Sequence, residues 1–351
     1  MSNLPGRSRS SVALGVAALI CASAPAGFAA PAEPALSPTN IFAPASSQAQ
    51  SILTVSNFVL LITASIFAVV FSLLAYAVLK FRAKKVDPRQ EPPQVYGSTQ
   101  LELAWTIVPI LIVGVLFLAT ARVIAEIQKP AATPETLAVT VVGHQFWWEY
   151  WYPAQKVVTA NELHIPVSDP AHPTPTLLTL LSADTDHSFW VPRLGGKTDL
   201  IPNHPNSMWI DPHETGLFLG QCAQYCGTQH AKMLLRVYVQ TRPEFDRWIE
   251  EQSRPAQAGG AVAEGQRIFE RTACMNCHAV AGTAANGRFG PDLTHLMSRD
   301  TIASGAAPNT PESLRAWIKD PGVLKPGSEM PAMGLSDSEL NAVTRYLETL
   351  R

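Results

Sequence analysis

The sequence lacks an excess of charge of either sign, and it lacks any internal repeat. Its 351 residues include 26 basic and 28 acidic side chains, a balance that gives no reason to expect a nucleic-acid partner. Cysteine is scarce as well, with five in the chain, so the close pairs that it forms call for an explanation. A chain of this length is expected to form two or three folded units.

The first 30 residues have the features of a secretory signal peptide. Two arginines precede a short apolar run, and small residues near position 30 form a cleavage site. The alternative, a membrane anchor, is disfavoured because the run is too short to span a bilayer. Cys21 follows a bulky isoleucine, a poor match to a lipoprotein acceptor site, and is expected to leave with the signal. Residues 31–50 then form an N-terminal segment.

Two longer apolar runs follow, at residues 52–81 and 103–127. Each exceeds the roughly 20 residues that a helix needs to cross the hydrocarbon core, so we expect a transmembrane helix hairpin over residues 51–130. The loop between the runs is rich in lysine and arginine, which places it in the cytoplasm. Everything after residue 130 is therefore expected on the outer, periplasmic face of a bacterial inner membrane.

The pattern changes twice after the membrane. Residues 131–248 contain short β-rich runs separated by proline and glycine, which predicts an antiparallel β-sandwich. Residues 249–261 have little apolar periodicity and are expected to be a linker. Residues 262–351 are predicted to form a small all-α domain, because amphipathic segments recur there with helix-start signals at Thr310 and at Ser336.

The helical segment contains the sequence CMNCH, from Cys274 to His278. This is the C-x-x-C-H pattern of covalent haem attachment, in which the two thiols bind the porphyrin and the histidine binds the iron. A disulfide with an uninvolved histidine and half of a zinc site are the alternatives. A zinc site would need a second pair of ligands, and this segment has no other cysteine.

A methionine before the last helix is the expected second iron ligand, since thioether ligation raises the reduction potential. The stretch KPGSEMPAM offers Met330 and Met333, and it resembles the methionine loop of class I c-type cytochromes, where proline often follows the ligand. Met330 is therefore preferred. The stretch FGPDL also resembles that family, which implies a hydrogen bond from His278 to the carbonyl of Pro291.

A second cluster of metal-binding residue types lies in GQCAQYCGTQHAKM, residues 220–233. Cys222, Cys226, His230 and Met233 supply the thiolate, imidazole and thioether ligands of copper electron-transfer sites. Two thiolates at this spacing can bridge two metal ions. A second histidine is then required from elsewhere, and His187 in DTDHSFWVP is the candidate. A disulfide or a zinc site could use the same cysteines, so both alternatives stay open here.

The order of these segments resembles a known family. The two membrane helices, GHQFWWEYWYP, DHSFWVPRLGGKTDLIPN and the cysteine loop are similar to subunit II of haem–copper cytochrome c oxidases. The appended C-x-x-C-H domain is similar to the fused cytochrome c of caa3-type oxidases. The resemblance implies a cupredoxin-like sandwich with a dinuclear copper centre of the CuA type. Its implied ligands are the sulfurs of the bridging Cys222 and Cys226, the imidazoles of His187 and His230, the weakly bound Met233 and the backbone carbonyl of Gln224.

Three positions qualify the resemblance. Gln224 stands where the family usually has a glutamate that also reaches a magnesium ion, so this chain keeps the carbonyl but lacks the charge for that second site. Phe146 replaces a tryptophan thought to assist the entrance of electrons, leaving Trp147 and Trp148 as aromatic candidates for that role. Glu102 resembles a carboxylate at the mouth of a proton channel, although a carboxylate near a helix N-terminus also favours the helix dipole.

The family implies a function for the chain. As the electron-donating subunit of a terminal respiratory oxidase, it would pass electrons from cytochrome c, or another periplasmic donor, through haem c and the copper pair. Subunit I would then reduce oxygen with proton translocation, and subunit III would complete the complex. The alternatives are the same role in a nitric oxide reductase, a membrane-tethered copper-delivery protein, and a structural domain with a Cys222–Cys226 disulfide.

Overall fold

A computed structural model describes residues 39–82, 94, 96–129, 136–256 and 262–351. The expected signal peptide with Cys21, most of the basic loop and part of the expected linker lie outside the described residues.

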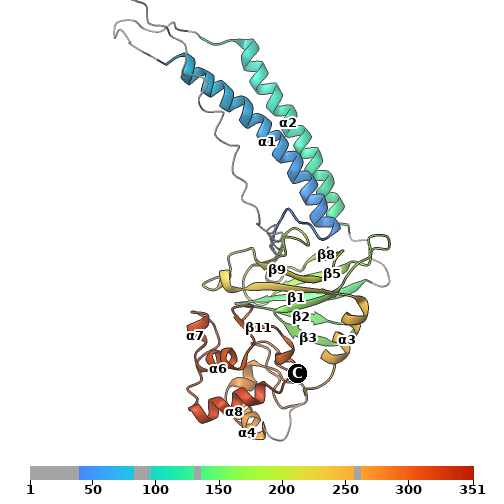
Figure 1. Cartoon of the computed structure of the whole chain (residues 1–351), viewed down its shortest axis with the longest axis vertical. Helices are drawn as coiled ribbons and strands as arrows, with labels where there is room; N and C mark the ends of the chain where they lie inside the picture. The colour runs from blue at the N-terminus through green and yellow to red at the C-terminus, as the bar shows by residue number, and fades with distance from the viewer. Residues whose placement is uncertain (1–38, 83–93, 95, 130–135, 257–261) are drawn as a thin grey trace, which may run out of the picture. The chain divides into compact units, whose positions relative to one another are not determined.

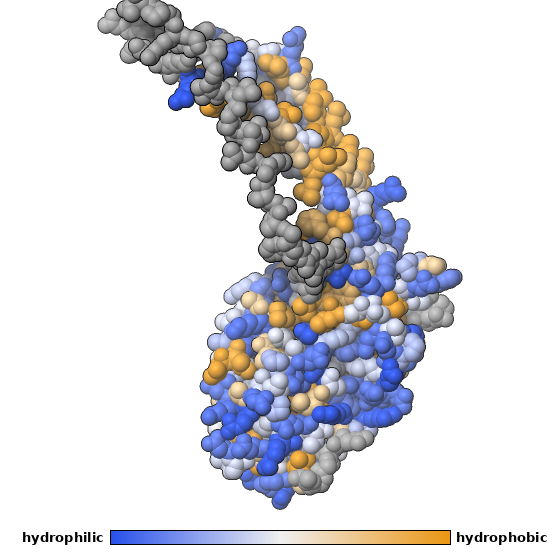
Figure 2. Space-filling view, in the orientation of Figure 1, coloured by the Kyte–Doolittle hydropathy of each residue, from blue (hydrophilic) through white to orange (hydrophobic). Residues whose placement is uncertain are grey.

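Two long helices form the hairpin expected near the N-terminus (Figure 1). Helix α1 spans Ser47–Lys80 and helix α2 spans Thr99–Ile127. Ser46 caps α1 by accepting a hydrogen bond from the backbone N–H of Ala49 at 3.1 Å. Both helices are long and apolar enough to cross a membrane, and neither apolar window is buried within the protein. Apolar side chains therefore cover their surface, as the orange helical region of Figure 2 shows.

The outer ends of both helices are joined to the sandwich by hydrogen bonds. The Ser46 hydroxyl donates to the carbonyl of Leu194 at 2.8 Å, beside the start of α1. The indole N–H of Trp209 donates to the carbonyl of Ile127, the last residue of α2, at 2.7 Å. These contacts hold the β-domain at the ends of the hairpin that lie opposite the expected cytoplasmic loop.

The middle of the described chain is a sandwich of two five-stranded sheets (Figure 1). One sheet has the order β3-β2-β1-β5-β8 and the other β4-β10-β9-β6-β7. Apolar side chains alternate into the space between the sheets, as along β10. The strands are β1 Leu137–His144, β2 Trp147–Tyr152, β3 Val157–Ala160, β4 Glu162–Pro166, β5 Thr176–Ser182, β6 His187–Trp190, β7 Thr198–Leu200, β8 Asn206–Ile210, β9 Gly216–Cys222 and β10 Leu234–Gln240.

The predicted sandwich is confirmed, but its sheets are mixed and not purely antiparallel. Strand β1 pairs with β5 in parallel, and β10 pairs with β4 in parallel. Each parallel pair joins strands that are far apart in the chain, so no hairpin forces them to run in opposite directions. The pattern of short apolar runs could not show this, because it carries no information about which strands are neighbours.

Helix α3, Arg242–Gln252, was not predicted and packs against β3 and β4, with Phe245 and Trp248 in the core of the sandwich. A capping box of Thr241 and Glu244 starts it. Its Trp248 stacks on the ring of His164 at 4.1 Å, and Tyr238 stacks on the same ring at 4.8 Å. His164 is buried by these contacts, and the burial lowers the pKa of its imidazole to about 4.

This buried histidine predicts an acid-sensitive sandwich. Unfolding restores the ordinary pKa of 6.5, so the unfolded state binds the extra proton between pH 6.5 and 4. The contribution of the neutral His164 ring to the free energy of unfolding is fully present above pH 6.5. The free energy of unfolding should fall by about 3 kcal/mol as the pH drops to 4. Urea denaturation at several pH values should show this fall, and His164→Phe should reduce it. The exposed His172→Phe should keep the wild-type slope, and an unchanged slope in His164→Phe would contradict the assignment.

The C-terminal residues form the small helical domain that the sequence predicted. Thr310 and Ser336 cap helices at their expected positions, and Ser336 forms the predicted capping box with Glu339. Apolar residues from α4 and α8 meet in a separate core. The elements are α4 Ala263–Arg271, α5 Cys274–Cys277, η3 Leu296–Ser298, β11 Thr301–Ile302, β12 Ala307–Pro308, α6 Pro311–Lys319, α7 Pro321–Leu324 and α8 Asp337–Leu347.

Candidate metal centres

The cysteine loop lies at one end of the second sheet. Cys222 is the last residue of β9, and it pairs with Phe189 of β6. His187 precedes Phe189 by two residues, so both side chains point to the same face of β6 and His187 lies diagonally across from Cys222. After Cys226, the short helix η1 (His230–Lys232) returns the chain to β10. Strand register thus joins His187 to a loop more than 30 residues away.

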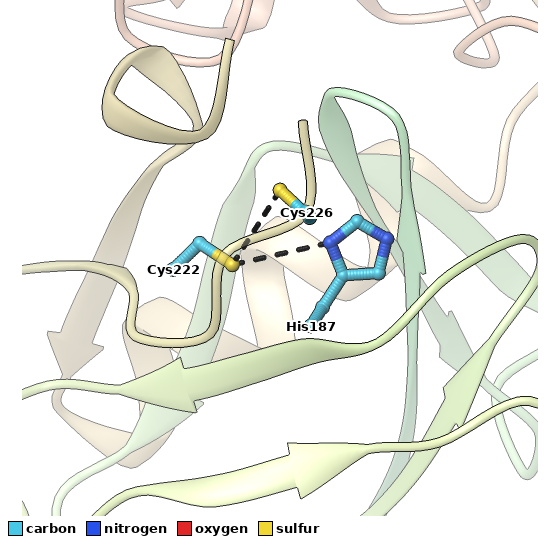
Figure 3. A group of neighbouring side chains, drawn as sticks. All are labelled: His187, Cys222 and Cys226. Carbon is cyan, nitrogen blue, oxygen red and sulfur yellow. Dashed lines mark hydrogen bonds between the residues drawn. The ribbon is translucent and has the colours of Figure 1, made fainter. Parts of the chain in front are cut away.

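The ligand atoms converge on a space that a metal ion can fill (Figure 3). The sulfurs of Cys222 and Cys226 lie 4.0 Å apart, about twice the length of a disulfide bond. Cys222 Sγ lies 3.9 Å from Nδ1 of His187, and Cys226 Sγ lies 3.7 Å from Nδ1 of His230. Two atoms bound to one metal at about 2.0–2.3 Å each lie no more than about 4.6 Å apart, so every one of these separations fits.

Two further donors complete the set. Met233 is fully buried, and its sulfur lies 4.0 Å from Cys226 Sγ. The backbone carbonyl of Gln224 lies 3.2 Å from Cys222 Sγ, whereas the residue itself is exposed. All six residues expected to bind copper therefore meet at one place. The contact with the Cys226 sulfur, and then with His187, lowers the pKa of Cys222, which favours the thiolate that a metal requires.

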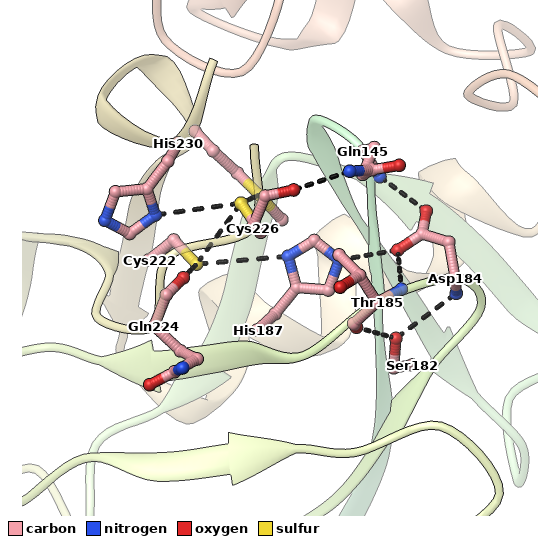
Figure 4. Close-up of polar contacts among 10 residues, drawn as sticks. Gln145, Ser182, Asp184, Thr185, His187, Cys222, Gln224, Cys226 and His230 are labelled. Atoms are coloured by element: carbon pink, nitrogen blue, oxygen red, sulfur yellow. Dashed lines mark hydrogen bonds and ion pairs between the residues drawn. The ribbon is translucent and has the colours of Figure 1, made fainter. Parts of the chain in front are cut away.

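Asp184 fixes the ring of His187 (Figure 4). Its carboxylate accepts a hydrogen bond from Nε2 of His187 at 2.7 Å, so Nε2 carries the proton and the lone pair of Nδ1 faces Cys222. Asp184 is itself held by the backbone N–H groups of Thr185 at 2.6 Å and Gln145 at 2.7 Å. Burial opposes the charged form, but these hydrogen bonds outweigh it and lower the pKa of Asp184.

A glycine and a glutamine of neighbouring elements also shape this centre. A Cβ on Gly143 of β1 would lie 2.8 Å from Cδ2 of His187, so the absence of a side chain lets the imidazole lie against the strand. The side-chain amide of Gln145 donates to the carbonyl of Cys226. Through Gln145, the turn between β1 and β2 thus contacts both Asp184, which supports His187, and the cysteine loop.

Removing the charge of Asp184 should weaken metal binding without unfolding the domain. Asp184→Asn keeps the shape but gives His187 a weaker acceptor, and such outer partners are worth roughly 10–100-fold in metal affinity. Competition with a copper chelator should measure this loss. Asp186→Asn, an exposed neighbour in the same loop, is the matched control and should bind copper as the wild type does. Equal affinities of the two variants would show that Asp184 has no such role.

A second centre lies in the helical domain, around the C-x-x-C-H segment. Cys274 and Cys277 are the ends of the short helix α5, and both are free and half-buried. His278 follows, and its Nδ1 lies 2.7 Å from the carbonyl of Pro291, as expected. Because a carbonyl only accepts hydrogen bonds, Nδ1 carries the proton and Nε2 keeps a free lone pair. Burial lowers the pKa of His278, which also favours the neutral ring that binds metal.

These residues line a largely apolar cavity. Met330 and Met333 line it as well, from the loop between α7 and α8, and both are half-buried. Arg299 is buried at the cavity wall, and its Nε has no hydrogen-bond partner among the described residues. An apolar cavity with two thiols, an imidazole, thioethers and two buried cations, Arg299 and Lys325, suits haem, which is a flat apolar ring with two carboxylates.

The aromatic candidates divide between the two centres. Trp148 is fully buried, and its ring lies 6.0 Å from that of His187. Phe146 and Trp147, in contrast, line the haem cavity from the sandwich side. Glu102 lies exposed in the first turn of α2, within the expected membrane hairpin and far along the chain from either centre.

Four side chains near the centres were missed by sequence reasoning. Asp184 carried a local signal, since a carboxylate three residues before a ligand histidine is well placed to support it. Gln145, Glu162 and Lys325 carried none, because their partners are distant in sequence.

Comparison with protein families matches the chain in three segments. Residues 36–122 match the family described as cytochrome C oxidase subunit II, transmembrane domain. Residues 172–240 match cytochrome C oxidase subunit II, periplasmic domain, and residues 262–351 match cytochrome c. One match thus falls within each of the three parts predicted from the sequence, namely the membrane hairpin, the β-domain and the helical domain.

Individual proteins match over most of the chain. Cytochrome c oxidase subunit 2 of Alkalihalophilus pseudofirmus is 35% identical over 315 residues, covering 88% of this chain and 90% of the relative. The protein of the same description from Bacillus sp. (strain PS3) is 32% identical and covers 77% of this chain and 80% of its own. Among solved structures, the periplasmic domain of subunit II of cytochrome oxidase from Bradyrhizobium japonicum is 29% identical, covering 34% of this chain and 95% of that one, with a TM-score of 0.32.

Proposed function

The chain belongs to the cytochrome c oxidase subunit 2 family, and from that premise we infer that it is the electron-donating subunit of a membrane-anchored terminal oxidase. Its two helices anchor it in the membrane, and the β-domain and the cytochrome c domain lie on the periplasmic side. The oxidase transfers electrons from cytochrome c to oxygen, which is reduced in subunit I. The observation that carries this function is the convergence of six copper-binding donors at the end of a sandwich that follows two membrane helices.

Copper is the metal that the family implies for the sandwich, and we propose that it is a dinuclear CuA centre. Cys222 and Cys226 would bridge the two ions, His187 and His230 would each bind one, and Met233 and the Gln224 carbonyl would be weak ligands. A copper pair bridged by two thiolates shares one electron and changes its ligands little on reduction. The protein's part is to hold the donors rigidly, through strand pairing at Cys222 and the Asp184 carboxylate at His187.

For the C-terminal domain, we propose covalent haem c. The thiols of Cys274 and Cys277 would bind the porphyrin, and His278 and Met330 would bind its iron. Pro291 supports this arrangement because it fixes the proton of His278 on Nδ1 and leaves Nε2 for the metal. The haem would accept one electron at a time from a periplasmic donor such as a soluble cytochrome c.

Subunit I is the partner that the family implies, and subunit III is proposed as a further one. Domain limits at about residues 130, 248 and 262 remain proposals, although α3 continues to Gln252. Glu102 is proposed as a carboxylate near the proton channel of subunit I. Trp147 is proposed as an aromatic contact for incoming electrons, because it lines the haem cavity. The comparisons favour neither a nitric oxide reductase nor a copper-delivery protein.

Purification of the oxidase through a tag on this chain tests the function. A catalytic subunit should co-purify, and the complex should consume oxygen when reduced cytochrome c is supplied. A complex that reduces nitric oxide but not oxygen, or a chain that is isolated alone and releases copper to an acceptor protein, would overturn the function.

A further inference from the structure

Two buried charged side chains cross the contact between the sandwich and the cytochrome c domain. Glu162 comes from β4 of the sandwich and is 2% exposed, and Lys325 follows α7 of the cytochrome c domain and is 3% exposed. Each side chain forms hydrogen bonds with backbone groups of the other domain, so the two contacts are reciprocal. Neither residue is a proposed metal ligand, and Lys325 also lines the haem cavity.

Glu162 accepts hydrogen bonds from a loop of the cytochrome c domain. Its Oε1 lies 3.0 Å from the backbone N–H groups of Asp300 and Thr301, and 3.0 Å from the Thr301 hydroxyl. A buried carboxylate that accepts several such bonds is held firmly, because losing them would leave only Arg236 of β10, whose Nε lies 3.8 Å from Oε1, to balance its charge. Asp300 directly follows Arg299 of the haem cavity wall, so this contact fixes the cavity against the sandwich.

Lys325 donates in the opposite direction. Its ammonium group lies 2.7 Å from the carbonyl of Phe146 and 3.1 Å from that of Ala303. Among the described residues, no carboxylate oxygen lies within 4.0 Å of this ammonium, and burial lowers its pKa to about 7. Burying an ammonium group away from any carboxylate costs free energy, because the group loses its water. Its two hydrogen bonds to carbonyls are what offset that cost.

Phe146, whose carbonyl accepts the hydrogen bond of Lys325, lies between the two centres. The Phe146 ring lines the haem cavity, and a Cβ on Gly227 would lie 3.0 Å from the edge of that ring. Gly227 is next to Cys226, whose carbonyl also accepts the hydrogen bond of Gln145. Lys325 therefore holds the segment that separates the haem cavity from the copper loop.

Smaller contacts surround this pair. The amide of Gln229, in the cysteine loop, donates to the carbonyl of Pro326. The exposed Lys232 donates to the carbonyl of Leu324 at 3.1 Å. Backbone and hydroxyl groups of Ser304 bond to Leu234 of β10 at 3.2 Å. The contact thus runs from the haem cavity along the cysteine loop to the first residue of β10.

We propose that Glu162 and Lys325 lock the cytochrome c domain onto the copper domain in one fixed arrangement, and that Lys325 is a positioning residue for electron transfer between the two centres. The proposal rests on the function inferred above. The transfer moves a single electron from ferrous haem, which becomes ferric, to the oxidised copper pair, and no bond forms or breaks. Its rate depends on the separation of the centres, which the lock holds constant, so no docking step precedes the transfer.

Flash photoreduction of the haem in the purified oxidase, with a ruthenium complex as photoreductant, tests the lock. In the wild type, the rate of copper reduction should not change with glycerol or with salt, because no domain has to move. In the Glu162→Gln/Lys325→Met double variant, the rate should fall by on the order of tenfold or more, since losing a buried charge-assisted hydrogen bond shifts an equilibrium by about that factor. It should also become slower as glycerol is added.

Control variants distinguish a role of Lys325 in positioning the domains from a general loss of folding or cofactor binding. Lys319→Met removes an exposed lysine of the same domain and should keep the wild-type rate, as exposed charges contribute little. Lys325→Arg keeps the donor and should recover part of the rate. The haem and copper absorption spectra should be the same in all variants. Because Lys325 lines the haem cavity, the haem reduction potential of each variant is measured and the rates are compared at equal driving force.

The outcomes also separate the lock from the function on which it rests. Normal haem and copper spectra with a wild-type rate that falls as glycerol is added would overturn the lock and leave the function intact. A double variant with normal spectra and an unchanged rate would overturn it too. Absence of copper reduction and of a copper spectrum in the wild type would overturn the proposed function itself.

Discussion

Replacing Cys226 by serine is expected to abolish the paired-copper spectrum and to lower oxidase turnover by more than about 100-fold. Even a residue that only supports a ligand is worth roughly 10–100-fold in metal affinity, and this change would remove the proposed bridging sulfur itself. The sulfur of Cys226 is the hub of the site, since it lies 4.0 Å from Cys222 Sγ, 3.7 Å from His230 Nδ1 and 4.0 Å from Met233 Sδ. A hydroxyl at this position is a poor ligand for soft copper.

Tyr225→Phe is the matched control for this change. Tyr225 lies in the same loop and is 74% exposed, so its variant should keep both copper ions and full turnover. Copper content, near-infrared absorbance and oxygen consumption are the measurements. A Cys226→Ser protein that retains two coppers and wild-type turnover would contradict the bridging role.

Replacing Met330 by histidine is expected to lower the haem reduction potential by some tenths of a volt, within the roughly 0.8 V range that axial ligands span. A thioether ligand favours ferrous iron, whereas a second imidazole favours ferric iron. The haem of the variant would then be a poor acceptor for electrons from a soluble cytochrome c, and turnover should fall with the potential. Spectroelectrochemical titration of the haem measures the change directly.

Met333 provides the comparison, because it lies on the same loop and lines the same cavity. Met333→Leu should leave the potential close to the wild-type value, since an apolar side chain of similar size fills the same space. The opposite result, a large fall in Met333→Leu and none in Met330→His, would assign the iron ligand to Met333.

Local sequence signals predicted the parts of the protein whose partners are close in the chain. The helix caps at Thr310 and Ser336 depend on residues three positions away, and both form as expected. The cysteine loop likewise brings Cys222, Cys226 and His230 together within nine residues. Chemistry and spacing are enough in these cases, because the backbone between the residues has few ways to separate them.

The position of His187 and the topology of the sheets depend on which strands become neighbours. His187 could be named as a candidate for its residue type, but only the pairing of β6 with β9 brings it to Cys222. The parallel pairs of the sandwich were missed for the same reason, whereas helix α3 carried a local signal in its capping box of Thr241 and Glu244. Glu162 and Lys325 resemble ordinary surface charges in the sequence, and their burial follows from a contact between domains that no local pattern encodes.

Electron paramagnetic resonance of the oxidised chain, together with a count of its copper and haem, tests the central assignment most directly. Two coppers per haem and a seven-line hyperfine pattern are predicted, because in the proposed centre one unpaired electron would be shared equally by two copper nuclei held between Cys222 and Cys226. One copper with a four-line pattern, or no copper and a disulfide between these two cysteines, would contradict the account.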